Sequence, residues 1–152
     1  MITSQTSSAL TIRLTIATPP KTIFEAITTR SGYAGWWTSD CDIDCRPGSD
    51  SFIRFAKDDK IEEMVFRTLV IRTDEYLEWH CVHNNVFESW IGSTLFFELT
   101  EIPGGSSLSF RQASAIPRWS RHPEYESGKS GWEFFLASLK RYCETGKGSP
   151  WQ

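Results

Sequence analysis

The sequence predicts an α+β protein in which an antiparallel sheet is followed by one long C-terminal helix. Apolar and polar residues alternate in several short segments up to residue 115, and the spacing becomes helical after residue 131. Turn residues such as Pro47-Gly48 separate the alternating segments at hairpin distances. The 152 residues suffice for a single domain with its own core, and we expect residues 1–8 to be flexible.

The first elements are a strand and two short helices. Residues 10–16 alternate strictly between apolar and polar side chains, as in a half-buried strand. Pro19 and Pro20 end this strand and favour the start of a helix, for which residues 23–27 provide an apolar face. A second, very short helix or turn is expected at residues 33–37.

Six further strands are predicted in the middle of the chain. Their expected ranges are 42–46, 52–57, 63–72, 76–82, 93–101 and 106–115. In the fourth range Leu77, Trp79 and Cys81 alternate with polar residues, so one face should meet the interior and the other water. The charged residues within these strands are expected on the outer face, although an inward arginine could hold an anionic ligand. They include Arg54, Arg67, Glu98 and Arg111.

The last helix is predicted over residues 131–145, with Gly146 as its C-terminal cap. A single apolar stripe follows the length of this helix. It comprises Trp132, Phe135, Leu136, Leu139 and Cys143. The polar stretch from residue 121 to residue 130 is expected to form a flexible lid or linker.

Composition excludes several classes of function. The net charge of -3, without a basic stripe, argues against a nucleic-acid partner. The N-terminus has no signal-peptide pattern and no apolar run is long enough for a membrane span, so we expect a cytoplasmic protein.

The four cysteines, at positions 41, 45, 81 and 143, are expected to be reduced thiols. Cys41 and Cys45 would lie roughly 13 Å apart in an extended segment, which is too far for a disulfide. No second pair or histidine follows them at zinc spacing, so we expect no metal site.

Catalytic and cofactor motifs are not found. The sequence has no G-x-S-x-G, no H-E-x-x-H and no glycine-rich phosphate loop, so we expect no cofactor. His83 continues the phase of Leu77, Trp79 and Cys81 and is a candidate for proton transfer or for ligand hydrogen bonding. The alternative is a loop histidine beside Asn84.

Aromatic residues point to a ligand cavity. They make up 14% of the chain and include seven tryptophans, a density found in cavity walls and interfaces as well as in cores. Trp36 and Trp37 are adjacent and cannot point the same way. We expect one ring to pack in the core and the other to border the cavity mouth, unless both belong to the core.

Four stretches resemble a known family: ATPPKTIFEAIT at residues 17–28, GWW at 35–37, RPG at 46–48 and GWEFFLASLKRYCETGKGSP at 131–150. With the order of elements, they resemble the START/SRPBCC superfamily, and within it the branch of activator of heat-shock protein 90 ATPase homologues. The resemblance covers nearly the whole chain. It implies the helix-grip fold, in which a seven-stranded antiparallel sheet curls around the long C-terminal helix and two short helices follow the first strand. An elongated cavity is expected between sheet and helix.

The favoured hypothesis is a cytoplasmic, cofactor-free protein that binds a small hydrophobic or aromatic molecule in this cavity. The expected lining consists of Trp36, Trp37, Trp79, Cys81, His83, Phe97, Phe110, Trp132, Phe135, Leu136 and Leu139. One alternative is an enzyme similar to the polyketide cyclases and dehydratases, which would need an acid or base in the cavity. A second alternative, suggested by the name of the branch, is a protein that interacts with a chaperone.

Overall fold

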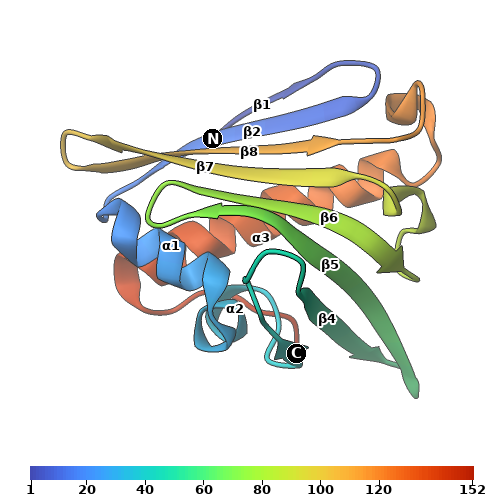
Figure 1. Ribbon diagram of the computed structural model, residues 1–152, viewed down its shortest axis with the longest axis horizontal. Helices are drawn as coiled ribbons and strands as arrows, with labels where there is room; N and C mark the ends of the chain where they lie inside the picture. The colour runs from blue at the N-terminus through green and yellow to red at the C-terminus, as the bar shows by residue number, and fades with distance from the viewer.

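The computed structural model describes residues 1–152 and contains one eight-stranded antiparallel sheet (Figure 1). The strand order across the sheet is β1-β2-β8-β7-β6-β5-β4-β3. The strands are β1 (Ile2–Gln5), β2 (Ala9–Ile16), β3 (Cys41–Asp42), β4 (Asp50–Lys57), β5 (Lys60–Arg72), β6 (Tyr76–Asn84), β7 (Thr94–Ile102) and β8 (Gly105–Ala113). The helices are α1 (Pro20–Thr28), α2 (Arg30–Trp36) and α3 (Tyr125–Thr145), with short 3₁₀ turns η1 (Glu88–Trp90) and η2 (Trp119–Arg121).

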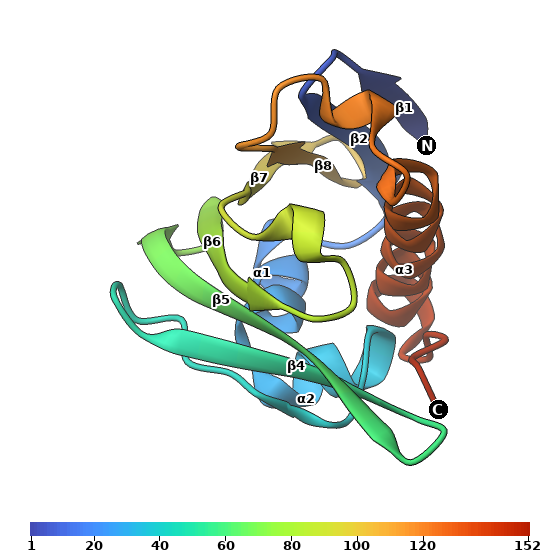
Figure 2. The same cartoon turned by 90° about the vertical axis from the view of Figure 1, so that its right-hand side faces the viewer.

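The sheet curls around α3, and α1 and α2 lie together beside the sheet and the C-terminal half of α3 (Figures 1 and 2). This is the helix-grip arrangement that the sequence predicted. The sheet has eight strands rather than seven. No helix has both the length and the apolar character needed to cross a membrane.

The additional strand comes from the segment that we expected to be flexible. β1 pairs with β2 along its whole length, from Ile2 opposite Arg13 to Gln5 opposite Leu10. Two side-chain hydrogen bonds tie it to α3, because Thr3 donates to Glu133 and Tyr125 donates to Gln5. The sequence of β1 has no apolar alternation, since the strand lies at the sheet edge and buries little, and the periodicity therefore missed it.

The strand expected at residues 42–46 is much shorter. β3 contains only Cys41 and Asp42, because the chain then turns and the backbone N–H of Arg46 donates to the Asp44 side chain at 3.1 Å. The second short helix begins at Arg30, three residues earlier than expected. There the Thr29 hydroxyl caps it by accepting from the backbone N–H of Gly32 at 3.0 Å.

α3 also begins earlier than predicted, at Tyr125, so the lid or linker expected at residues 121–130 is wrong. Most of that stretch is the first turns of the helix. Tyr125 is buried and packs edge-on against Trp119 with ring centroids 4.9 Å apart. Glycine and serine in these turns are poor helix formers, and tertiary packing outweighs their preference. The predicted cap is confirmed: Gly146 has φ +83° and its N–H donates to Tyr142.

Thirty buried residues form one hydrophobic cluster between the sheet and the helices. It contains the inward side chains of β2, which are Leu10, Ile12, Leu14 and Ile16. The four charged strand residues that were expected on the outer face lie there, namely Arg54, Arg67, Glu98 and Arg111. Arg54 pairs with Glu63, Arg67 pairs with Asp50, and the guanidinium of Arg111 lies over the ring of Phe96.

Candidate functional site

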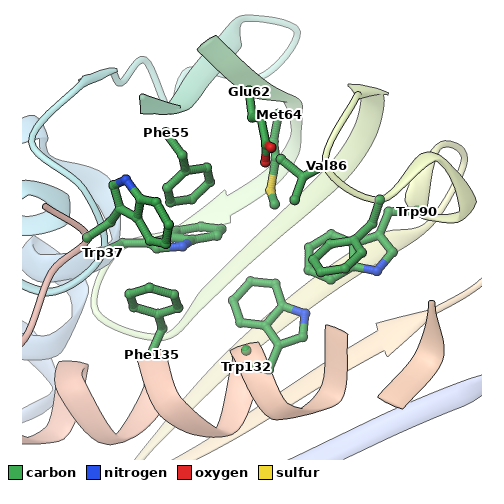
Figure 3. Close-up of a pocket in the computed structure, with 11 residues that line it drawn as sticks. Trp37, Phe55, Glu62, Met64, Val86, Trp90, Trp132 and Phe135 are labelled. Carbon is green, nitrogen blue, oxygen red and sulfur yellow. The ribbon is translucent and has the colours of Figure 1, made fainter. Parts of the chain in front are cut away.

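An apolar pocket opens between the β4–β5 hairpin and the N-terminal half of α3 (Figure 3). Its cavity volume is about 170 Å³, and nine of its eleven lining residues are hydrophobic. The lining consists of Trp37, Phe55, Glu62, Met64, Val86, Phe87, Trp90, Gly131, Trp132, Phe135 and Trp151. Larger hollows on the surface are lined mostly by polar residues, so this pocket is the best candidate for an apolar ligand.

The β4–β5 hairpin provides one wall of the pocket. Its register places Phe55 opposite Glu62 and Ile53 opposite Met64, and residues paired in this way share one face of the sheet. The inner phase of β5 therefore runs through Phe66 and Met64 and then reaches Glu62 at the open end of the hairpin. The carboxylate of Glu62 thus stands where the strand pattern would place an apolar side chain.

α3 provides the opposite wall of the pocket, and the absence of a side chain at Gly131 leaves part of that wall open. A Cβ placed on Gly131 would meet no atom within 4 Å. One turn earlier, a Cβ on Gly128 would lie 3.1 Å from the Trp90 indole, so that position is filled. Trp132 and Phe135 project from the same side of α3 toward the hairpin (Figure 3).

The loop after β6 closes the third side. The side-chain oxygen of buried Asn84 accepts from the N–H groups of Val86 at 2.9 Å and Phe87 at 2.7 Å, which folds the chain back. Phe87 then stacks on Trp90 with centroids 4.8 Å apart. Trp90 in turn stacks on Trp132 at 5.5 Å with only 7° between the ring planes. The loop is thereby fixed against α3.

A carboxylate at the start of α3 anchors the same loop. Glu124 accepts a hydrogen bond from the N–H of Ser89 in η1 at 3.0 Å. Partial burial alone would raise the pKa of this carboxyl, but the hydrogen bonds from Ser89 and the nearby His122 lower the pKa below its usual value. The charged form is therefore the one that holds η1 in place.

The two adjacent tryptophans have different environments. Trp36 is fully buried, and its indole N–H donates to the carbonyl of Ala26 at 2.8 Å. Trp37 turns its ring toward α3, 5.1 Å from the ring of Trp132, and lines the pocket.

Trp151 completes the wall beside Trp37. Its backbone N–H donates to the Trp37 carbonyl at 2.7 Å and its indole N–H donates to Ala56 at 3.2 Å. The ring meets Phe55 edge-on, with centroids 5.7 Å apart. This pairing places the C-terminal residues of the chain over one edge of the pocket.

Three of the eleven residues expected to line a cavity belong to this wall: Trp37, Trp132 and Phe135. Seven others are buried in the core and do not border the pocket. They are Trp36, Trp79, Cys81, Phe97, Phe110, Leu136 and Leu139. These side chains pack against one another in one cluster, and the space that remains is the small pocket beside Gly131.

His83 is exposed and points away from the interior, so its expected place in the cavity is wrong. The pairing of β5 with β6 shifts by one residue here: Val65 faces His83, whereas the next residue, Phe66, faces Cys81. Val82 is the extra residue of this bulge. A bulge reverses the inward and outward alternation of the side chains that follow it, and no residue type in the sequence indicates a bulge at this position.

The titratable groups of the interior are held neutral. Burial raises the pKa of the Cys45 thiol to about 11 and those of Cys81 and Cys143 to about 12. Burial also raises the pKa of Tyr33 well above its usual value. None of these groups supplies a nucleophilic anion at neutral pH. Glu62 is the single charged residue in the pocket wall.

Sequence reasoning missed eight lining residues, which are Phe55, Glu62, Met64, Val86, Phe87, Trp90, Gly131 and Trp151. Phe55 and Met64 follow the alternation of their strands and could have been included on that basis. Trp90 and Trp151 belong to segments without periodicity, whose positions depend on the Asn84 turn and on the pairing with Trp37.

The profile of the family described as "Activator of Hsp90 ATPase homolog 1-like protein" matches residues 17–144. This range includes both helices after β2, the whole of β3–β8 and nearly all of α3. No match was found among curated protein sequences.

Solved structures share the fold over nearly the whole chain. The Aha1 dimer from Colwellia psychrerythraea is 25% identical, with a TM-score of 0.76 over 92% of this chain and 98% of that one. Protein CV1439 from Chromobacterium violaceum is 18% identical, with a TM-score of 0.76 over 91% and 99%. DynU16, from the dynemicin biosynthetic locus, is 18% identical, with a TM-score of 0.73 over 95% of this chain and 51% of that one.

Proposed function

This chain belongs to the family of activator of Hsp90 ATPase homolog 1-like proteins, and we propose that it binds a small hydrophobic or aromatic molecule in the pocket between the β4–β5 hairpin and α3. The observation that carries the proposal is a hollow walled by seven aromatic rings, with space that no side chain of the protein fills. Such a hollow favours apolar ligands because binding removes the surfaces of ligand and rings from water.

The volume limits the size of the ligand. At about 170 Å³ the pocket is smaller than the roughly 300–1,000 Å³ of sites for drug-sized molecules. It is close to the ~150 Å³ of an apolar cavity that takes up benzene. One aromatic ring with small substituents therefore fits this space, whereas a polyketide chain or a sterol does not.

Filling the pocket from α3 tests the proposal. Leucine at position 131 would extend from the helix into the open space beside Trp132, so the Gly131→Leu variant should fold and lose binding. We expect tert-butylbenzene to change the tryptophan fluorescence of the unaltered protein saturably and to raise its melting temperature. In Gly131→Leu both responses should fall at least tenfold.

Gly131→Ala is the matched control. Its methyl group meets no neighbouring atom, and alanine favours a helix interior over glycine by about 1 kcal/mol, so this variant should be more stable and should still bind. The proposal is wrong if the unaltered protein shows no response to the apolar probe. It is also wrong if Gly131→Leu binds the probe as well as the Gly131→Ala control does.

A chaperone partner is the second candidate, supported by the family description. Exposed apolar side chains next to lining residues fit this reading: Ile61 precedes Glu62, Phe134 packs edge-on against Phe135, and Trp151 is 37% exposed. A surface of this kind suits contact with another protein. The measurement that separates the two candidates is the ATPase rate of an Hsp90 with and without this chain.

A further inference from the structure

We infer that the pocket selects an organic cation, an ammonium group that carries small apolar substituents or one ring. The inference rests on the proposed function and narrows its ligand class. Its basis is the combination of aromatic rings around the hollow with one carboxylate at its edge. Both features favour a cation over a neutral molecule of the same shape.

Glu62 is placed to meet a ligand. It belongs to the inner phase of β5 with Met64 and Phe66, and its side chain extends toward the rings beside Met64 (Figure 3). The carboxylate is half-buried and makes no side-chain hydrogen bond or ion pair within the protein. Its neighbour Glu63, on the outer face, is in contrast paired with Arg54 at 2.8 Å. A charge in this position favours a partner of opposite sign.

The rings add to the same preference. Trp37, Phe55 and Phe135 lie on one side of the hollow and Trp90 lies on the other, with Trp132 on the helix between them (Figure 3). A cation within about 6 Å of a ring centroid is attracted by the negative face of the ring, and tryptophan gives the strongest attraction. Quaternary ammonium groups are recognised by such cages of rings.

The wall has no positively charged group that would favour an anion. The indole N–H of Trp90 has no hydrogen-bond partner, and its nitrogen lies beside Gly128 of α3, 3.1 Å from where a Cβ would stand. The indole N–H of Trp132 donates to Gln112 at 2.8 Å and that of Trp151 donates to Ala56, so neither is free for a ligand. No arginine, lysine or histidine is among the lining residues. Fatty acids and other carboxylates would therefore face Glu62 without a compensating positive charge.

Two compounds of the same shape test the inference. Phenyltrimethylammonium carries a positive charge, and tert-butylbenzene is its neutral counterpart. Tryptophan fluorescence titrations of both are compared in the unaltered protein, in Glu62→Gln and in Glu101→Gln. The last variant removes an equal charge from the far end of β7 and controls for the net charge of the protein.

We expect Glu62→Gln to bind phenyltrimethylammonium about fivefold or more weakly than the unaltered protein does, since it loses a charge partner at a partly desolvated position. Binding of tert-butylbenzene should be equal in both, and Glu101→Gln should behave as the unaltered protein. Equal affinity of Glu62→Gln and the unaltered protein for the cation overturns the inference, as does binding of the neutral compound alone. If neither compound binds the unaltered protein, the proposed function itself is wrong.

Discussion

Trp36 and Trp37 show how one peptide bond separates a core position from a pocket position. Trp36 ends α2, with its N–H bonded to α1 and its carbonyl accepting from Ser138 of α3 at 2.8 Å. Trp37 is the residue after the helix, where the backbone leaves the helical path. The ring of Trp36 is fully buried, while that of Trp37 borders the hollow.

This difference predicts unequal effects on stability. Trp36→Ala should lower the free energy of unfolding by about 3–5 kcal/mol, the usual cost of removing a fully packed aromatic side chain. Trp37→Ala should cost less, because part of its ring already borders empty space and the new cavity joins an existing one. Urea midpoints of the two variants check this. Equal losses would mean that Trp37 is an ordinary core residue.

Single residues are also where prediction from the sequence was weakest. The adjacent tryptophans and the α3 stripe drew attention to Trp37, Trp132 and Phe135, and the structure places these three at the pocket. Periodicity cannot tell a ring that lines a cavity from one that fills it, because both are buried and share one phase. Trp79 and Phe110 are therefore indistinguishable from Trp132 in the sequence, yet they lie within the packed core.

Among the elements, η1 is held in part by a single charged side chain. It is a turn of three residues, and Glu124 at the start of α3 holds it through the N–H of Ser89. The lowered pKa of Glu124 means that its carboxyl group loses its proton more readily in the folded protein than in the unfolded chain, so the charged form stabilises the fold. The resulting stabilisation is present above the unfolded pKa of 4.5 and is lost as the pH falls through the lower, folded value.

Glu124→Gln should remove this pH dependence. At pH 7 the variant should be less stable by up to about 1 kcal/mol, since the carboxylate is partly exposed to water. At pH 3 the two proteins should approach equal melting temperatures, because the carboxyl is becoming protonated in the unaltered protein as well. Melting curves at both pH values make the measurement. A gap of the same size at pH 3 and pH 7 would show that Glu124 acts through its shape and not through its charge.

Element boundaries show which signals a sequence carries. The alternating phases located β2 and β4–β8 well, since each buries one face against the helices. The bulge at Val82 and the early start of α3 were not foreseen, because each depends on contacts with another segment of the chain: the bulge on the pairing with β5, and the start of α3 on the hydrogen bond from Tyr125 to Gln5. His83 and the stretch 121–130 were misplaced for this reason.

At the scale of the molecule, α3 is the centre about which the sheet is arranged. It contacts α1, α2 and β2, and its side chains join the same hydrophobic cluster as the inner residues of the sheet. Leu139 lies in this cluster with no exposed surface. The order of elements was predictable from the alternating and helical spacing of apolar residues, and the helix-grip fold was implied by the family resemblance.

Leu139→Asp should therefore unfold the protein. Burying an unpaired charge costs several kcal/mol, which is a large part of the roughly 5–15 kcal/mol that stabilises a typical domain. Phe134→Asp is the control, because Phe134 lies on the same helix with 54% of its surface exposed and should change stability by less than about 0.5 kcal/mol. Far-UV circular dichroism compares the two. A folded Leu139→Asp protein with an unchanged melting temperature would contradict the assigned face of α3.

The stacking of the tryptophans has an optical consequence. Trp90 and Trp132 are nearly parallel at 5.5 Å, and Trp132 is followed at similar spacing by Trp37 and Trp36. Indoles so close together transfer excitation energy to one another, so a photon absorbed by one tryptophan can be emitted by another. A molecule that quenches the fluorescence of the pocket tryptophans would thus also reduce the fluorescence of Trp36 in the core. The emission of the protein is in this way a collective signal that responds to a single small hollow.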